Sequence, residues 1–320
     1  MQITNKSVNI MGIDLVYLWV DSNDSQWLAR KNAFLGLESD NDDANCKGRF
    51  TSNDELKYAL RSVEKYVPWI RKIFIVTDRQ TPAWLDISHP KIQIVDIEEI
   101  LPQEALPCYN SVVIECFLYR LPGLSEYFLY SNDDMFFNSD VLPDFFFAKD
   151  GFPIVRLQKK PLGKWRYRWK HLTGKSLSTY RQTIVRAAQL TEEKFGEYYS
   201  GIPHHNVDAY RKSDYQTAVE NVFADEVMAS VPHHLRNRED VQRATFLYYA
   251  LTIKRGHLKY VTHSESSVFD VQKGNFEHYF RKYNPLLFCI NDGECVTDTD
   301  RQNAKDFLGK YFSKKSSFEK

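Results

Sequence analysis

The sequence has no long apolar segment and none of the usual signals for export. No run of about 18 apolar residues occurs, so no transmembrane helix is predicted. The N-terminus has no basic stretch followed by an apolar core and a small-residue cleavage site, so no signal peptide is expected. Repeats and low-complexity tracts are missing too. The sequence therefore predicts a cytoplasmic protein with one large domain or two closely joined ones.

The chain also lacks an excess of charge and paired cysteine motifs. Its 42 Lys and Arg residues balance 42 Asp and Glu residues, so no overall field favours binding to nucleic acid. The five cysteines are odd in number and include no C-x-x-C pair. This pattern predicts reduced, mostly structural thiols and argues against a zinc site.

Apolar segments and amphipathic segments alternate in the first half of the 320 residues. Strands are predicted at residues 13–20, 72–77, 91–95 and 126–131. Helices are predicted at residues 52–67 and 110–121, with a shorter one near 27–37. Ser52 and Glu55 form the S-x-x-E pattern of a capping box. The alternation predicts an α/β fold with a mostly parallel sheet.

Acidic residues stand where these strands end: Asp21, Asp78, Asp96 and the pair Asp133-Asp134. Ligands of such sheets bind outside the carboxyl ends of the strands. For Asp78 and Asp96 we favour the simpler role of turn residues. Asn132-Asp133-Asp134 is the better candidate, because Mg²⁺ is usually held by one or two carboxylates together with substrate phosphates. By itself, an acidic pair in this position is a plain turn equally often.

The second half differs in composition. Between residues 151 and 190 there is no acidic residue but ten Lys or Arg residues. Helices are predicted at residues 180–198, 214–230, 239–252 and 301–320, and one or two strands within 257–270. The basic, aromatic stretch at 159–171 suits contact with a phosphate-rich acceptor or with an anionic membrane surface. A solvated face explains that stretch equally well.

Two motifs of this half contain residues suited to phosphate chemistry. In His204-His205 either imidazole is a candidate general base near neutral pH, and the other is expected to be structural. Arg236 lies just before a predicted helix start, where phosphate also binds, and Asn237 is the predicted cap of that helix.

Four blocks share their order with one known family. Residues 13–21, IDLVYLWVD, are similar to I-D-x-V-Y-T-W-V-[ND], and a long second block spans 53–134. Residues 205–212 follow H-x-P-x-x-[YFL]-x-K, with valine in place of proline, and the fourth block joins 236–242 to the later 289–292. The chain thus resembles the Stealth-type sugar-phosphate transferases. These include bacterial capsule and exopolysaccharide phosphotransferases and the animal N-acetylglucosamine-1-phosphotransferase.

The resemblance implies a Rossmann-like, GT-A-related core in residues 1–150 that binds a nucleotide sugar. It also implies that residues 151–320 form a mostly helical acceptor and catalytic part that completes the same active site. A UDP-sugar donor, a Mg²⁺ or Mn²⁺ ion and release of UMP are expected. The expected partner is a glycan acceptor, lipid-linked in some members, on the cytoplasmic side. A peripheral contact with the inner membrane face is also expected, and no nucleic acid.

The resemblance also implies roles for single residues. His205 would take the acceptor proton, Arg236 would stabilise the transferred phosphoryl group, and Asp133 and Asp134, with Asp292, would hold the metal. Donor-binding roles fall to Asp21, Asn53, Arg61, Ser111, Asn132 and Asn291. An ion pair with a purely structural function is the alternative for Arg61. The main alternative activity is a metal-dependent GT-A glycosyltransferase that releases UDP, and a second is a non-catalytic sugar-binding subunit.

Overall fold

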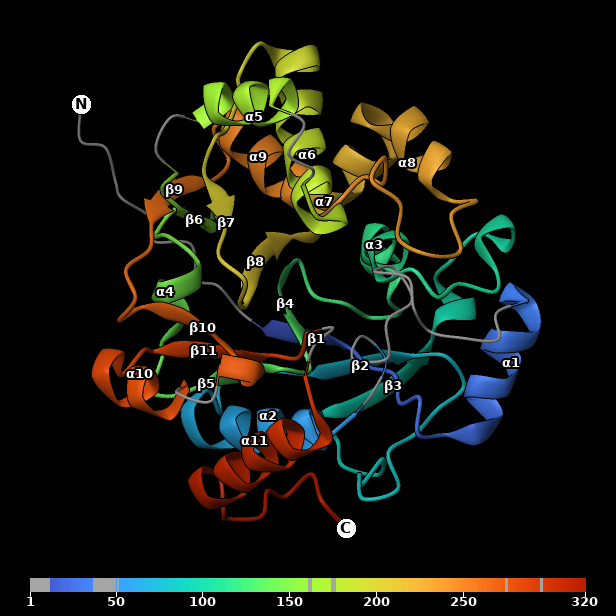
Figure 1. The fold of residues 1–320 in the computed structure, drawn as a ribbon, viewed down its shortest axis with the longest axis vertical. Coiled ribbons are helices and arrows are strands. Elements are labelled where there is room, and N and C mark those ends of the chain that lie inside the picture. The colour runs from blue at the N-terminus through green and yellow to red at the C-terminus, as the bar shows by residue number, and fades with distance from the viewer. Residues whose placement is uncertain are drawn as a thin grey trace.

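The structure, a computed structural model, describes residues 12–36, 50, 52–160, 163–173, 177–273, 276–293 and 296–320. Its central sheet has five strands in the order β3-β2-β1-β4-β8 (Figure 1). The strands are β1 (Ile13–Leu18), β2 (Ile73–Thr77), β3 (Ile92–Asp96), β4 (Tyr127–Asn132) and β8 (Asp208–Arg211). The first four are parallel and β8 runs antiparallel to β4. The predicted α/β fold with a mostly parallel sheet is confirmed.

Helices cover both faces of this sheet, which explains why its parallel strands are mostly apolar. The helices are α1 (Ser25–Leu35), α2 (Glu55–Tyr66), α3 (Ser111–Cys116), α4 (Pro143–Phe146), α5 (Gly163–Leu172), α6 (Thr179–Phe195), α7 (Lys212–Thr217), α8 (Ala224–Ser230), α9 (Ala244–Thr252), α10 (Phe276–Tyr283) and α11 (Asp298–Tyr311). In β1, Val16 packs in one apolar cluster, while Leu15 and Tyr17 pack in the opposite one. Alternate residues of a strand face opposite sides, so a strand between two helical layers needs an unbroken apolar run.

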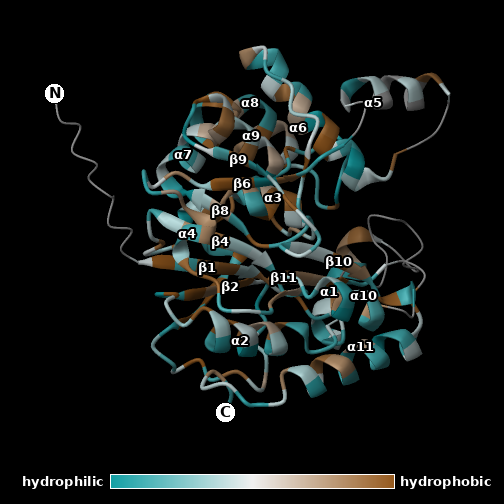
Figure 2. Cartoon of the chain, turned by 90° about the vertical axis from the view of Figure 1, so that its left-hand side faces the viewer, coloured by the Kyte–Doolittle hydropathy of each residue, from teal (hydrophilic) through white to brown (hydrophobic). Residues whose placement is uncertain are grey.

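The two helical layers come from different parts of the chain. Helices α3, α6 and α9 contribute Ile114, Ile184 and Leu247 to the Val16 cluster. Helices α2 and α11 contribute Leu60 and Leu308 to the cluster on the other face. Figure 1 shows α2 and α11 below the sheet and α3, α6 and α9 above it. Figure 2 gives the same layers from the side, with α5 projecting from the upper one.

Two smaller sheets accompany the central one. One is ordered β10-β11-β5 and the other β7-β6-β9. Their strands are β5 (Met135–Phe137), β6 (Ile154–Gln158), β7 (Ile202–Pro203), β9 (His257–Tyr260), β10 (Ser266–Asp270) and β11 (Leu287–Asn291). The second half is helical, as expected, but it also contributes strands. Because β8 pairs with β4 and β11 pairs with β5, the two halves of the chain share two sheets. The division into a nucleotide-sugar-binding half and an acceptor half stays a prediction.

Shorter helical turns complete the described fold. Four are 3-10 turns: η3 (Ile97–Glu99), η4 (Gln103–Ala105), η5 (Leu118–Arg120) and η7 (Val271–Lys273). A π-helical segment, η6 (Ala218–Val222), separates α7 from α8, so the helix predicted over 214–230 is two helices. In the described part of the chain, no helix combines the length and apolar character needed to span a bilayer.

The structure corrects two predictions about chain ends and caps. The capping box is wrong because Asp54 is the N-cap of α2, so Glu55 is the first helical residue rather than the third. Its carboxylate accepts hydrogen bonds from the backbone N–H and the side-chain amide of Asn53 instead. The C-terminal helix ends at Tyr311, and the following segment packs back on the core through the buried side chain of Phe318.

Candidate active site

A cavity of about 700 Å³ opens at the carboxyl ends of β1, β2 and β4. This is the position at which parallel α/β sheets bind ligands, and its size suits a small-molecule substrate. Eight of the predicted site residues line it: Ser111, Asn132, Asp133, Asp134, His205, Arg236, Asn291 and Asp292. The fold therefore brings the predicted acidic pair, imidazole and guanidinium to one cavity, although they are far apart in the sequence.

One wall of the cavity is acidic. Asp133 and Asp134 form the turn between β4 and β5, and Glu55 lines the cavity from the start of α2. Burial, followed by repulsion from Glu55 and Asp134, raises the pKa of Asp133 well above its usual value. Burial likewise raises the pKa of Asp134 to about 6 and that of Glu55 to about 7.

This crowding of carboxylates fits a divalent cation. Oδ1 of Asp134 is buried and makes no hydrogen bond within the described residues. Like charges held together in a buried place raise each other's pKa, and a bound cation removes that repulsion. Hard cations such as Mg²⁺ and Mn²⁺ prefer oxygen ligands. Asp133 and Asp134 are therefore suitable ligands for the predicted ion.

The other predicted metal ligand is already engaged. Asp292 lines the cavity, but its two carboxylate oxygens accept from Nε and Nη2 of Arg301 at 2.7 and 3.1 Å. Its neighbour Asn291 donates from its side-chain amide to Asp270 at 3.3 Å. A carboxylate held by a bidentate guanidinium has fewer lone pairs left for a metal. Glu55, which sequence reasoning placed in a cap, is the third carboxylate of the acidic wall.

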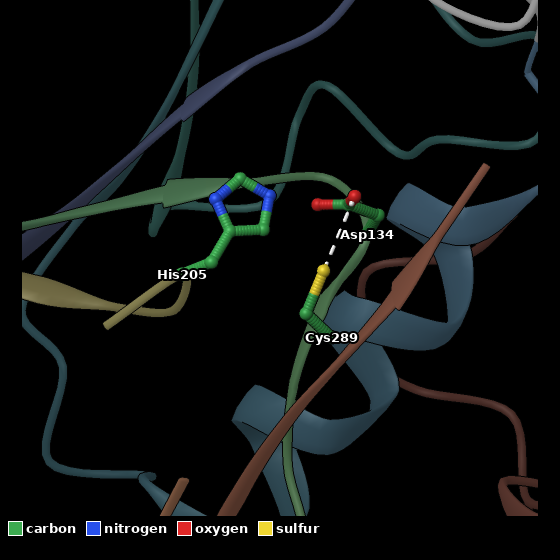
Figure 3. A group of neighbouring side chains, drawn as sticks. All are labelled: Asp134, His205 and Cys289. Carbon is green, nitrogen blue, oxygen red and sulfur yellow. Dashed lines mark hydrogen bonds between the residues drawn. The ribbon is translucent and has the colours of Figure 1, made fainter. Parts of the chain in front are cut away.

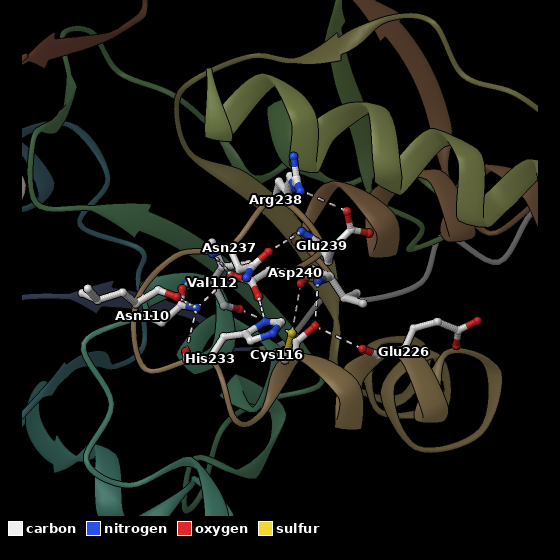
Figure 4. Close-up of polar contacts among 12 residues, drawn as sticks. Asn110, Val112, Cys116, Glu226, His233, Asn237, Arg238, Glu239 and Asp240 are labelled. Carbon is white, nitrogen blue, oxygen red and sulfur yellow. Dashed lines mark hydrogen bonds and ion pairs between the residues drawn. The ribbon is translucent and has the colours of Figure 1, made fainter. Parts of the chain in front are cut away.

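Arg236 lines the cavity from a folded loop. Figure 4 shows the polar contacts that hold this loop, around Asn110, His233 and Asp240. Its centre is the buried carboxylate of Asp240, which accepts from the Asn110 side-chain amide at 2.8 Å and from the Asn237 N–H at 2.7 Å. His233 Nδ1 lies 2.6 Å from the other oxygen of Asp240. These contacts tie the loop to the N-terminus of α3.

The same loop corrects the predicted helix start. Helix α9 begins at Ala244, and the Asn237 side chain accepts from the Glu239 N–H within a turn. Arg236 then donates from Nε and Nη2 to Oγ of Ser111, at 3.2 and 2.6 Å. Ser111 is the first residue of α3, so the guanidinium lies at a helix N-terminus, where anions also bind.

The two adjacent histidines have different environments. The His204 ring is buried, with Nδ1 2.9 Å from Ser266 Oγ and Nε2 3.2 Å from the Val207 carbonyl oxygen. Its partners are thus internal, and its role is structural. His205 instead lines the cavity and packs edge-on against Tyr180. His205 is therefore the imidazole that is able to meet a substrate.

Burial and neighbouring positive charge keep the His205 ring neutral. Burial, and then the positive charges of Arg243 and Arg236, lower the pKa of His205 to about 3. Arg243 is 5% exposed and pairs with Glu115 at 3.5 Å and with Asp208 at 3.4 Å. Nδ1 of His205 is buried with no hydrogen-bond partner in the described structure. A neutral ring with an unused nitrogen is able to accept a proton.

Three predicted donor-binding residues lie outside the cavity lining. Asp21 accepts from the Asn23 N–H in a turn after β1, and Asn53 is bonded to Glu55. Arg61 forms a bidentate ion pair with Glu319 of the C-terminal segment at 2.7 and 2.8 Å. These contacts agree with the alternative given above for Arg61, an ion pair with a purely structural function.

Besides Glu55, sequence reasoning missed two charged residues of the lining. Arg181, on α6, has a buried Nη1 that makes no hydrogen bond to any described residue. Only the basic composition around residues 156–186 pointed towards it. Asp78 lines the cavity too, although we expected a plain turn, whereas Asp96 caps η3 in agreement with the turn prediction.

Helix α5 contains the basic, aromatic stretch and lies apart from the cavity lining. Trp165, Trp169 and Leu172 are 72%, 67% and 83% exposed. They follow each other at spacings of four and three, so they share one helical face. Lys164 pairs with Glu192 on α6. The helix thus presents an apolar face within a segment that has no acidic residue.

Two family models match the chain in order. Residues 11–38 match Stealth protein conserved region 1, and residues 49–155 match Stealth protein conserved region 2. The chain belongs to the Stealth family. Both matches end before His205 and Arg236. The roles proposed for these two residues therefore rest on motif resemblance and on the geometry of the cavity.

Curated relatives extend over most of this Stealth chain. The capsular polysaccharide phosphotransferase SacB of Neisseria meningitidis serogroup A is 33% identical over 326 residues, covering 96% of this chain and 57% of SacB. The exopolysaccharide phosphotransferase CpsY of Mycobacterium tuberculosis is 33% identical over 325 residues, covering 97% of this chain and 58% of CpsY. The chain thus spans somewhat more than half the length of these relatives.

Solved structures that resemble this chain are glycosyltransferases. The galactosyltransferase LgtC, in complex with donor and acceptor analogues, has a TM-score of 0.47 at 12% identity, covering 95% of this chain and 96% of LgtC. The bifunctional glycosyltransferase WbbM has a TM-score of 0.48 at 9% identity, covering 96% and 50% of the two chains. Because both scores are below 0.5, we draw no functional conclusion from them.

Proposed function

We propose that this chain transfers a hexose 1-phosphate or an N-acetylhexosamine 1-phosphate from a UDP-sugar to a hydroxyl of a glycan acceptor, with release of UMP. The main support is that His205, Arg236 and the Asp133-Asp134 pair line one cavity at the carboxyl edge of the sheet. The names of SacB and CpsY support a phosphotransferase that builds a capsular or exopolysaccharide.

In the proposed reaction, the acceptor oxygen bonds to the β-phosphorus of the donor. The bond between that phosphorus and the bridging oxygen breaks, and UMP leaves with the electron pair. His205 takes the proton of the acceptor hydroxyl, a contribution of roughly 10²–10⁴-fold. Arg236 and Arg181, on the basic side of the cavity, hold the phosphate oxygens and neutralise their charge.

A bound Mg²⁺ or Mn²⁺ would neutralise negative charge on the diphosphate. Asp133 and Asp134 are its proposed ligands. Besides burial, the positive charges of Arg243 and Arg236 lower the pKa of His205. The negative charge of a diphosphate opposes these cations, so donor binding should raise that pKa and make the ring a better base.

The product of the donor distinguishes this proposal from its main alternative. The purified chain is incubated with individual UDP-sugars and an oligosaccharide acceptor, and UMP and UDP are measured separately. We expect UMP to accumulate only when donor and acceptor are both present. If UDP accumulates instead, the chain is a glycosyltransferase, and if the donor binds without turnover, it is a binding subunit.

The two adjacent histidines provide an internal comparison. We expect His205→Ala to lower kcat by about 10²-fold or more with little change in thermal stability, because its ring has few internal partners. His204→Ala should lower the melting temperature, because it leaves Ser266 and Asp208 with unmet polar groups. His257→Ala, at an exposed pair with Asp150, is the control. Full activity of His205→Ala would remove the proposed base.

We also propose that α5 contacts an anionic membrane surface. Interfacial helices combine a basic composition with exposed tryptophan and leucine on one face. The exposed face of Trp165, Trp169 and Leu172 fits this description. Such a contact would bring a lipid-linked acceptor close to α6, which contributes Tyr180 and Arg181 to the cavity.

A further inference from the structure

Three side chains with different ligand atoms meet at the acidic wall of the cavity (Figure 3). A carboxylate oxygen of Asp134, a ring nitrogen of His205 and Sγ of Cys289 lie within 4.8 Å of one another. Asp134 comes from the β4–β5 turn, His205 from the segment after β7, and Cys289 from the buried strand β11. We name these three residues the cavity triad.

The cavity triad has unused ligand capacity. Asp134 Oδ1 and His205 Nδ1 are both buried and have no hydrogen-bond partner among the described residues. Cys289 donates its thiol proton to Asp134 Oδ2, at 3.3 Å. Buried polar atoms normally have a partner, so two unmet atoms beside a thiol indicate a place for a ligand that binds O, N and S together.

The chemistry of this set differs from that of the Asp133-Asp134 pair. Mg²⁺ and Mn²⁺ favour oxygen, whereas Zn²⁺ binds thiolate, imidazole and carboxylate in a tetrahedron. Tetrahedral ligands at zinc distances are roughly 3.5 Å apart, so closing from 4.8 Å needs side-chain shifts of about 1 Å. Three protein ligands leave the fourth position for water.

We propose that the cavity triad binds Zn²⁺, and that zinc bound there inhibits the transferase reaction proposed above. Binding releases the thiol proton of Cys289 to solvent and forms a zinc–thiolate bond. The zinc ion engages the nitrogen of His205, so the ring is no longer free to take the acceptor proton. It also engages Asp134, so the same carboxylate is less able to hold Mg²⁺. The regulatory part of this inference rests on the proposed function, whereas the metal site itself does not.

Co²⁺ is a spectroscopic probe of the site that needs no activity. The full chain should give a sulfur-to-cobalt charge-transfer band and the visible bands of tetrahedral Co²⁺, and Zn²⁺ should abolish both. Cys289→Ser should lose the charge-transfer band. Cys108→Ser is the matched control, because Cys108 is also buried but bonds to the Asn110 carbonyl. Cys46 and Cys295 lie outside the described residues, so Cys46→Ser and Cys295→Ser are included and should keep the band.

A second variant tests the site in case Cys289→Ser, in the buried strand β11, does not fold. His205→Ala should keep the thiolate band but bind Co²⁺ at least about tenfold more weakly, since even outer partners of metal ligands are worth 10–100-fold. A charge-transfer band that persists in Cys289→Ser, or wild-type protein that binds Co²⁺ without a thiolate signal, would overturn the proposed site.

The regulatory part is tested by UMP release in Mg²⁺. Zn²⁺ should inhibit the wild-type chain. Cys289→Ser, measured relative to its own rate without Zn²⁺, should need at least about tenfold more Zn²⁺ for the same fractional inhibition. Equal inhibition of both proteins would overturn the regulatory role. If the wild-type chain releases no UMP with any donor, the proposed function fails, while the cobalt spectra still decide whether the metal site exists.

Discussion

The clearest quantitative test concerns Glu55, whose pKa is raised from 4.5 to about 7. The main cause is burial, and Asp134 adds repulsion. A carboxyl whose folded pKa is above its unfolded pKa loses stability as pH rises through the interval between them. At 1.36 kcal/mol per pKa unit, the cost approaches about 3 kcal/mol at pH 8 and is about 1 kcal/mol at pH 5.

Glu55→Gln imitates the protonated carboxyl, so the variant should avoid this cost. In urea denaturation with EDTA, it should be more stable than the wild type by about 3 kcal/mol at pH 8 and about 1 kcal/mol at pH 5. Relief of the repulsion on Asp133 should add to the gain at pH 8. Glu104→Gln, at an exposed position, is the control and should change stability by less than about 0.5 kcal/mol.

Mg²⁺ adds a second arm to the same experiment. A cation bound at Asp133 and Asp134 relieves the repulsion, so it should stabilise the wild-type chain at pH 8 more than it stabilises Glu55→Gln. If the stability difference between the two proteins is the same at pH 5 and pH 8, Glu55 does not titrate as inferred. The acidic wall would then not be the electrostatic centre of the cavity.

Two further predictions concern the interior and the surface. Arg243→Met leaves Glu115 and Asp208 as unpaired buried carboxylates, so urea denaturation should show a loss of about 3–5 kcal/mol. A loss of unfolding free energy below about 1 kcal/mol would mean that Arg243 and its two carboxylate partners are not buried in solution. The double variant Trp165→Ala/Trp169→Ala should co-sediment less with anionic vesicles than the wild type, while neutral vesicles retain neither protein. Equal sedimentation would show that α5 is not the membrane contact.

The sheet was predictable because its signals are local. Each strand of the parallel part is an apolar run bounded by turn residues, and the segment at 13–18 could hardly be anything but a strand buried on both sides. The antiparallel β8 was missed because Asp208–Arg211 is short and carries charge at both ends. Its pairing with β4 depends on contacts about 80 residues apart in the sequence, which no local pattern encodes.

The site was predictable in part, for a similar reason. The acidic pair stands at a strand end, and a strand end locates a ligand site without knowledge of the rest of the fold. The register of the third block pointed to His205, and the structure adds a physical reason, because neighbouring residues of an extended chain point to opposite sides and His205 is the one that lines the cavity. Glu55 was misread because S-x-x-E predicts a cap from spacing alone, whereas its true role depends on the carboxylates that the β4–β5 turn places opposite.

The cavity is best understood as an electrostatic arrangement with an acidic side and a basic side. Glu55, Asp133 and Asp134 repel one another in the absence of a cation, and this repulsion appears in their raised pKa values. Arg181 and Arg236, which also line the cavity, supply its basic side. A diphosphate with its cation satisfies both sides at once, because the cation neutralises the carboxylates and the phosphate oxygens neutralise the guanidiniums. A neutral sugar or a metal-free anion would satisfy only one side, so the arrangement supports a diphosphate donor bound with its cation. Reaction at phosphorus and reaction at the anomeric carbon both use such a donor, and release of UMP rather than UDP decides between them.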